Sequence, residues 1–371
     1  MAAPPCRACG NQEGEIVLDL GNQPACDYFP AKNDPRPDPV YPLQMWLCTR
    51  CGLAQLVDDP TVPEEPRGAE PVALITQAAD AVQRVADAAL LRSGMTAVEY
   101  GSPHGGSWAS LLADRDIAVV PEGPGDVVLD CFGLMHRADQ AAALAQRAAR
   151  VAPDGLLLIQ YHSLATIVQR GQWNSLRHGH YAYYSTAALG AMLAAEGFTP
   201  LTAWQFELYG GTVLLAATRR AGERRQPDPA LRALTSHEDR LRVRDPERVR
   251  ILQSAAAASA AAVRDWLAKQ RAAGTAVLGY GAASRAVALL CLAGIDSGLL
   301  PAIADASQAK QGRRMPGTDI PVIEPEELVT YRPDVVLLFL PDLLPEVQDQ
   351  LPEVVNAGGQ WVDVESLTTV T

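Results

Sequence analysis

The residues best suited to chemistry stand in one short run, Arg177 to Ser185, which reads RHGHYAYYS. Two of the six histidines and three of the ten tyrosines of the chain fall in these nine residues. Histidine moves protons near neutral pH, and tyrosine supplies a hydroxyl and a flat face for a ligand. Taken alone, the run fits a catalytic loop and equally fits an aromatic-rich helix start packed between domains.

A second group with chemical potential consists of two C-x-x-C-G knuckles, CRACG starting at Cys6 and CTRCG starting at Cys48. Each knuckle can place two thiolates on one tetrahedral metal ion. A closed structural zinc site is therefore predicted, with free thiols or a redox pair as the alternative. Its ligands would be Cys6, Cys9, Cys48 and Cys51. Cys26, Cys131 and Cys291 have apolar neighbours and are predicted to be core thiols.

The composition limits the classes of function. A length of 371 residues, 48% hydrophobic and 20% charged, predicts a globular protein with two or three domains. A net charge of -12 argues against nucleic acid or an anionic membrane surface as a partner. The sequence shows no apolar run that could span a bilayer and no signal-peptide pattern at its start. A cytoplasmic monomer is the expectation.

The elements that must position these groups follow a strand–turn–helix pattern that appears twice. Residues 95–108 read MTAVEYGSPHGGSW, a short strand that ends in an acid and a glycine turn that leads into a helix. Residues 276–286 read AVLGYGAASRA, and Asp305 follows the next apolar strand, where a ribose-binding acid would stand. Both units predict an α/β fold of the Rossmann kind. An α/β domain without a ligand is the alternative for the second unit.

The order of these parts resembles the sugar-nucleotide C-methyltransferases, which make branched deoxysugars in antibiotic pathways. The motifs that carry the resemblance are the two knuckles, the run HGHYAYYS, the segment YGGT from Tyr209, GYGAASR from Gly279 and AKQGRRMPG from Ala309. The resemblance implies S-adenosylmethionine as the methyl donor and a TDP-linked keto-sugar as the substrate. It also implies four parts: a zinc-binding module over 1–62, a methyltransferase-like α/β domain over 72–220, connecting helices over 221–273 and a Rossmann-like sugar-nucleotide-binding domain over 274–371.

The resemblance also assigns roles to residues. The second histidine, His180, would remove the proton beside the keto group, with His178 as its neighbour, and Arg177 or Tyr181 could stabilise the charge of an enolate or a phosphate. The glycine turn would bind the cofactor through Glu99, Gly101 and Gly105. The expected substrate-binding residues are Tyr209, Gly210, Gly211, Thr212, Gly281, Ser284, Arg285, Asp305, Lys310 and Arg313, with Arg314 beside them. For the three cations from Lys310 to Arg314, which suit a diphosphate, a solvated basic loop is the alternative.

The chain departs from the family pattern around the cofactor and the base. Gly179 stands where the family has a glutamate between the histidines, and Arg177 stands where it has a tyrosine. A tyrosine- and serine-rich segment is replaced by EPRGAEP at residues 65–71, and the glycine motif reads EYGSPHG in place of EIGSNDG. Between the first helix and the strand at Asp126, roughly fifteen residues are missing, enough for a strand and a helix.

Three functions stay open on this evidence. The protein transfers a methyl group with a reduced cofactor pocket, or it keeps only the proton transfer. In the second case the enolate is reprotonated, as in an epimerase or isomerase, or it expels a β leaving group. The third function is a non-catalytic sugar-nucleotide-binding protein. The sugar, the carbon and the stereochemistry are not determined by the sequence.

Overall fold

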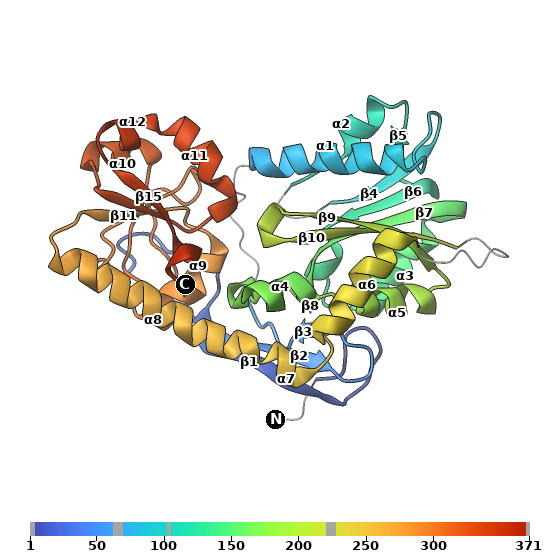
Figure 1. The fold of residues 1–371 in the computed structure, drawn as a ribbon, viewed down its shortest axis with the longest axis horizontal. Helices are drawn as coiled ribbons and strands as arrows, with labels where there is room; N and C mark the ends of the chain where they lie inside the picture. Colours follow the sequence, from blue (N-terminus) through green and yellow to red (C-terminus); the bar gives the residue numbers. More distant parts are fainter. Residues whose placement is uncertain (1–3, 62–69, 102–104, 220–227, 369–371) are drawn as a thin grey trace.

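A computed structural model describes residues 4–61, 70–101, 105–219 and 228–368. The described chain forms three β-sheets, one at the N-terminal module and one in each of two α/β units, as Figure 1 shows. Most of the segment between the expected zinc-binding module and the expected methyltransferase-like domain, the centre of the glycine turn at 102–104 and the expected boundary at 220–221 lie outside the described residues. No described helix is both long and apolar enough to cross a bilayer.

The N-terminal sheet has four antiparallel strands in the order β1-β2-β3-β8. The strands are β1 (Gly14–Pro24), β2 (Val40–Cys48), β3 (Ala54–Leu56) and β8 (Ala182–Tyr183). The first three belong to the cysteine module, but β8 comes from the histidine- and tyrosine-rich run more than a hundred residues later. Ala54 is paired with Tyr183 and Gln55 with Ala182. The module and the candidate catalytic run therefore share one hydrogen-bonded sheet.

The middle unit has six strands in the order β5-β4-β6-β7-β10-β9. They are β5 (Ala118–Val119), β4 (Thr96–Tyr100), β6 (Gly125–Cys131), β7 (Val151–His162), β10 (Thr212–Thr218) and β9 (Thr199–Phe206). Strands β5 to β7 are parallel, and β10 and β9 continue antiparallel. Runs of Val and Leu make the parallel strands because both faces of this sheet are covered.

Helices cover both faces of the middle sheet (Figure 1). One face carries α1 (Val72–Asp87) and α2 (Ala109–Ala113), and the other carries α3 (Gln140–Ala149), α5 (Thr186–Ala195) and α6 (Pro229–Leu241). Helix α1 buries Leu74, Ala78, Val82 and Val85 at helical spacing, which directs its apolar side to the sheet. Shorter helical segments follow the strands: α4 (Leu164–Arg170), η1 (Leu134–His136), η2 (Trp173–Ser175) and η3 (Leu208–Gly210).

The C-terminal unit is a parallel five-stranded sheet in the order β13-β12-β11-β14-β15. Its strands are β13 (Val322–Ile323), β12 (Ile303–Ala304), β11 (Val277–Tyr280), β14 (Val335–Leu338) and β15 (Gln360–Asp363). Its helices are α9 (Ser284–Ala293), α10 (Pro325–Tyr331), α11 (Leu344–Gln350), α12 (Pro352–Asn356), η4 (Pro341–Leu343) and η5 (Val364–Leu367). Helices α7 (Pro246–Val249) and α8 (Ile251–Ala272) connect the units, and α8 runs from the N-terminal sheet to the C-terminal unit (Figure 1).

The expected α/β class with a four-cysteine module is confirmed, and several local predictions need correction. The alanine-rich segment after residue 72, whose apolar residues recur at helical spacing, is helical only as far as Asp87. Pro153 to Gly155, residue types that are typical of turns, lie inside β7, where Asp154 has a left-handed φ of 60°. The segment between the cysteine knuckles is a long β-hairpin rather than a series of turns. Between Ala113 and Gly125, all of which is described, β5 is the one regular element, so the expected loss of a strand and a helix is observed.

A buried carboxylate joins α6 to the start of α5. Glu238 is 2% exposed and accepts hydrogen bonds from the Thr186 amide at 2.8 Å, the Thr186 hydroxyl at 2.7 Å and the Ala187 amide at 3.3 Å. Burial raises the pKa of Glu238 despite these bonds. The carboxylate satisfies amides that a helix leaves unpaired in its first turn, and it places α5 directly after the histidine- and tyrosine-rich run.

Replacing Glu238→Ala is expected to lower the free energy of unfolding by about 2 kcal/mol, because two amides and a hydroxyl lose their buried partner. Urea denaturation followed by circular dichroism measures this loss. The matched control is Asp239→Ala on the same helix, whose carboxylate is 66% exposed and should change stability by less than about 0.5 kcal/mol. Equal effects of the two substitutions would contradict the assignment of this contact.

Candidate functional site

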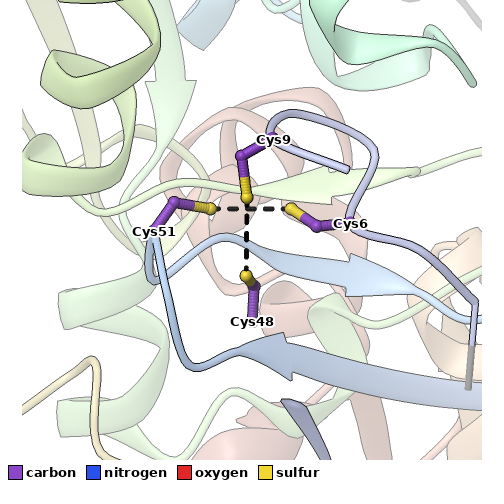
Figure 2. Close-up of side chains that lie close together, drawn as sticks. All are labelled: Cys6, Cys9, Cys48 and Cys51. Carbon is purple, nitrogen blue, oxygen red and sulfur yellow. Dashed lines mark hydrogen bonds between the residues drawn. The ribbon is translucent and has the colours of Figure 1, made fainter. Parts of the chain in front are cut away.

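The four knuckle cysteines meet at one point. Their sulfur atoms lie within 4.8 Å of one another, and the Cys6–Cys51 and Cys9–Cys48 pairs are 3.5 and 3.8 Å apart. Figure 2 shows the four side chains pointing toward a common centre. A tetrahedral zinc ion with Zn–S bonds of about 2.3 Å needs sulfurs roughly 3.8 Å apart. The residues therefore fit the predicted closed, structural zinc site.

Arg7, between the first two cysteines, ties this metal site to the histidine loop, the name used here for residues 177–185. Its backbone amide donates to the Gln55 side chain at 2.8 Å, and its guanidinium donates to the carbonyls of Leu56 and Ala138. The same guanidinium lies 4.9 Å from the centre of the Tyr181 ring. Because Tyr181 directly follows His180, the contact of Arg7 with Tyr181 restrains the backbone at His180.

The backbone of the histidine loop is held by groups from three sides. The Gly179 amide donates to the Asp59 carboxylate at 2.6 Å, and the Tyr181 amide donates to the Met135 carbonyl at 2.8 Å. Gly179 has φ +81°, a left-handed conformation that side-chain-bearing residues rarely adopt. This turn presents the Gly179 carbonyl to Nδ1 of His136 at 3.0 Å. Gly179 thus has a conformational role at the position where the family has a glutamate.

A cleft of about 180 Å³ opens where the histidine loop meets both α/β units. Its wall includes His180 and Arg177 from the loop, His136 and His162 from the middle unit, and Tyr209 from η3. The C-terminal unit contributes Ser284, Arg285 and Lys310, and the glycine turn contributes Gly105. Proton-transfer groups and cations from distant parts of the sequence therefore border one space.

His180 is enclosed by charged and aromatic neighbours. It is 4% exposed, and its ring makes an edge contact with the His136 ring, with centroids 4.7 Å apart. The Arg177 Nε–H donates to Nδ1 of His180 at 3.4 Å. A second nitrogen of the same guanidinium donates to the Ser284 hydroxyl on α9. Arg177 thus bridges the candidate base and the C-terminal unit.

His136 is neutral over the physiological range. Burial is the main cause that lowers its pKa to about 4, and the positive charge of Arg177 acts in the same direction. Because the Gly179 carbonyl can only accept, Nδ1 of His136 carries the proton of the neutral ring and Nε2 carries the lone pair.

An aromatic stack also borders the cleft, next to the His180 ring, whose centroid lies 6.5 Å from that of His162. The His162 and Tyr209 rings are nearly parallel, with centroids 5.5 Å apart, and Phe132 makes edge contacts with both. Tyr209 has a left-handed φ of 54° and is followed by Gly210 and Gly211, which also have positive φ. A Cβ on Gly210 would lie 1.9 Å from Gln172. The YGGT segment therefore places the Tyr209 ring on His162 through a turn that tolerates no larger residue.

The cations of the cleft gather at the N-terminus of α9. Arg285 is 8% exposed, and burial, followed by the charge of Arg177, lowers the pKa of its guanidinium. Lys310 donates to the Ala282 carbonyl at 2.8 Å and lies 3.9 Å from the Asp305 carboxylate. A helix N-terminus with three nearby cations favours an anionic group.

Several residues expected at the site lie outside this cleft. The His178 ring packs edge-on against Tyr41, with its Nε2 3.3 Å from the Pro42 carbonyl. Arg313 donates to the Phe29 carbonyl, and Arg314 forms a two-point ion pair with Asp38 at 2.6 and 2.7 Å. Tyr181 packs on Arg7. Five further expected residues do not border the cleft: Gly210, Gly211, Thr212, Gly281 and Asp305. Of the three cations from Lys310 to Arg314, Lys310 alone borders the cleft.

The expected cofactor residues stand at the carboxyl end of β4. The Glu99 carboxylate accepts from the Trp108 amide at 2.6 Å and the Ser107 hydroxyl at 2.7 Å, so it already holds the start of α2. A Cβ on Gly133 would meet the Gly101 carbonyl at 2.7 Å, which shows how closely the ends of β4 and β6 approach. Gly105 borders the cleft that holds His180. A methyl donor bound at the carboxyl end of β4 would therefore lie next to the cleft that holds His180.

His136 and His162 were not singled out by the sequence reasoning. Each is an isolated histidine with no neighbouring motif. His162 is the last residue of β7, and His136 follows β6 within five residues. Ligands in parallel α/β sheets bind beyond the carboxyl ends of the strands. That rule, applied to each strand in turn, is the signal that could have found both.

Comparison with known families agrees with this architecture. Residues 6–65 match a family model described as "Putative zinc binding domain", residues 112–203 match "Methyltransferase domain", and residues 207–364 match "C-methyltransferase C-terminal domain". The three models follow one another along nearly the whole chain. The chain is therefore similar to C-methyltransferases in three successive segments. The match to the middle model begins at residue 112, after β4 and the glycine turn where the sequence departs from the family.

A curated relative extends over the same length. The chain is 24% identical to the C-methyltransferase NovU of Streptomyces niveus, over 96% of this chain and 94% of that protein. Solved structures match a part of this chain at a lower level. A 1,6-didemethyltoxoflavin-N1-methyltransferase of Burkholderia thailandensis is 17% identical, with 45% of this chain and 95% of that one covered and a TM-score of 0.29.

A magnesium protoporphyrin IX methyltransferase of Synechocystis is 11% identical, with 40% of this chain and 84% of that one covered and a TM-score of 0.31.

Removal of the metal is expected to loosen the histidine loop as well as the knuckles, because Arg7 and β3 connect them. Chelator treatment should lower stability and speed amide hydrogen exchange in residues 181–184 by about tenfold or more. Exchange measured by mass spectrometry, with metal content from elemental analysis, checks this. Cys291→Ser, outside the cluster, should keep the metal and the slow exchange. Unchanged exchange in metal-free protein would refute the connection.

The depressed pKa of His136 predicts a pH dependence of stability. The unfolded protein binds a proton at this histidine near pH 6.5, whereas the folded protein binds it only near pH 4, so acidification favours unfolding within that window. The wild type should therefore lose about 1.4 kcal/mol per pH unit relative to His136→Asn between these values. Denaturation at several pH values measures the difference. The matched change His237→Asn, on the outer helix α6, should leave the wild-type slope intact, and a slope equal to wild type in His136→Asn would contradict the prediction.

Proposed function

We propose that the protein removes an α proton from a TDP-linked keto-deoxysugar and transfers a methyl group from S-adenosylmethionine to the resulting carbanion. The observation that carries the proposal is the position of His180, in a cleft bordered by the cations at the α9 N-terminus and by Gly105 of the glycine turn. A substrate anion, a base and a donor edge would therefore meet in one place.

The diphosphate of the substrate would lie at the N-terminus of α9. Arg285 and Lys310 supply positive charge there, and the Ser284 hydroxyl supplies a neutral hydrogen-bonding group. Guanidinium groups pair with phosphate oxygens through two parallel hydrogen bonds. An anion at this point would hold the sugar in the cleft that the histidines also border.

His180 would accept the α proton as the C–H bond breaks, and the electron pair would move onto the keto oxygen as an enolate. His136 supports this role: it is neutral, it contacts the His180 ring edge-on, and its position is fixed by the Gly179 carbonyl. The positive charge of Arg285 and the Tyr209 hydroxyl are the nearby groups able to stabilise the enolate oxygen. Burial of His180 and Arg285 strengthens such interactions, because the effective dielectric constant is lower there than in water.

The donor would supply the methyl group, and the chain offers part of a site for it. Gly101 and Gly105 at the carboxyl end of β4 would hold its methionine part, since backbone there approaches the end of β6 closely. Glu99 holds the turn in place through Ser107 and Trp108. The residues fit the methyl-donating end of the cofactor, and the missing strand and helix leave the adenosine end with few contacts.

This shortened edge favours a second candidate function, proton transfer without methylation. An enolate with no donor is reprotonated, which gives epimerisation or isomerisation, or it expels a β leaving group. The same cleft and the same base would serve this reaction. The two functions differ in whether the protein needs S-adenosylmethionine.

One experiment with a TDP-linked keto-deoxysugar in deuterated water tests both functions. With the wild type, deuterium should enter at the α carbon, and added S-adenosylmethionine should convert the sugar to a product heavier by a methyl group. His180→Asn should slow deuterium uptake by about a hundredfold or more, and His237→Asn should not. Deuterium uptake without methylation would support the second function. A wild type that takes up no deuterium would refute both functions.

A further inference from the structure

We infer that Arg177 caps the candidate base His180 in the free protein and that the diphosphate of the substrate removes this cap. The inference rests on the proposed function and adds a step that precedes the proton transfer. It concerns a residue that departs from the family pattern, and it makes Arg177 a positioning residue that couples anion binding to the base.

The hydrogen bond between the two residues determines which atom of His180 is available. An arginine side chain has donors and no acceptor, so Nδ1 of His180 must offer its lone pair to the Arg177 Nε–H. The neutral ring then carries its proton on Nε2. In this state His180 has no second lone pair with which to remove a proton from carbon.

The cap is held weakly. The N···N distance of 3.4 Å is long against the usual 2.9–3.0 Å, and the second contact of Arg177 is to the neutral hydroxyl of Ser284. Among the described residues, no carboxylate forms an ion pair with Arg177. The guanidinium instead lies close enough to Arg285 to lower the pKa of that group. Among the described residues, Arg177 thus has no carboxylate within ion-pair distance, at a site that also holds the cations Arg285 and Lys310.

A diphosphate compensates this charge better than the present partners. Hydrogen bonds between ionised groups are roughly twice as strong as those between neutral groups, and the guanidinium matches two phosphate oxygens at once. Ser284, which Arg177 now contacts, begins α9, where the anion would bind. The Arg177 side chain therefore needs to change partners within the same cleft, and the backbone of the histidine loop can stay in place.

Arg177 exchanges one hydrogen-bond acceptor for another, and no covalent bond of the protein changes in this step. The hydrogen bond from Arg177 Nε–H to Nδ1 of His180 breaks, and a hydrogen bond from the guanidinium to a phosphate oxygen forms. No proton leaves the guanidinium. The released lone pair on Nδ1 then accepts the α proton, and the electron pair of the C–H bond moves onto the keto oxygen. The base is thus exposed when the anionic substrate is bound, and the imidazolium that forms is no longer in contact with a second cation.

Nitrogen NMR on protein labelled with 15N at histidine tests the cap directly, with inorganic pyrophosphate as the probe. In the free wild type, the Nδ1 signal of His180 should show a hydrogen-bonded acceptor, and saturating pyrophosphate should move it to the position seen in Arg177→Met. In Arg177→Met the signal should not respond to pyrophosphate, and calorimetry should show pyrophosphate binding weakened by about tenfold. The exposed Arg137, changed to Met, is the matched control and should behave like the wild type.

Three results would overturn the inference. The Nδ1 signal of His180 is the same in wild type and Arg177→Met without the anion, or pyrophosphate binds to the wild type without moving that signal, or pyrophosphate does not bind. The wild-type titration decides the matter even if Arg177→Met does not fold. None of these measurements uses a sugar or a methyl donor, so a failed deuterium-uptake experiment refutes the proposed function separately.

Discussion

The antiparallel pairing of β3 with β8 is the contact on which the candidate site depends. It is short, yet it joins the cysteine module to a segment more than a hundred residues away. The Leu56 amide extends the pairing by donating to the Tyr181 carbonyl at 3.2 Å, and the fully buried Gln55 is bonded to the knuckle backbone at Arg7. His180 is therefore held from the side of the metal site, and the two α/β units supply the other walls around it.

This arrangement explains why a structural zinc site occurs in a protein whose chemistry would take place elsewhere. The N-terminal module is small, and a four-cysteine site stabilises such a module where its hydrophobic core cannot. Strand β8 is two residues long and would not pair stably by itself. A rigid module gives β8 a fixed partner in β3, and this pairing restrains the backbone of the histidine loop.

Sequence reasoning found the features whose signal is local. Two cysteines with two residues between them can place both thiolates on one ion, so the metal site was predictable. The run of histidines and tyrosines is likewise visible in the sequence itself. Sequence reasoning could not find contacts between residues that only the tertiary fold brings together. Arg314 reads as a phosphate ligand by charge, but its partner Asp38 lies 276 residues away. His136 and His162 are single residues whose proximity to His180 depends on the order of strands in the sheet. The hairpin between the knuckles was missed because its strands carry glycine, proline and polar residues that are typical of turns.

The two-residue strand β5 has a consequence for the kind of donor molecule that this protein would accept. Both of its side chains are exposed, and no further strand follows it before β6. A donor bound at the glycine turn would be held at its amino-acid end, and between Ala113 and Gly125 the described chain offers its purine no strand or helix other than β5. Selection among donors would then depend on the sulfonium and amino-acid groups, and analogues enlarged or altered at the base would be tolerated where a full-length sheet would reject them.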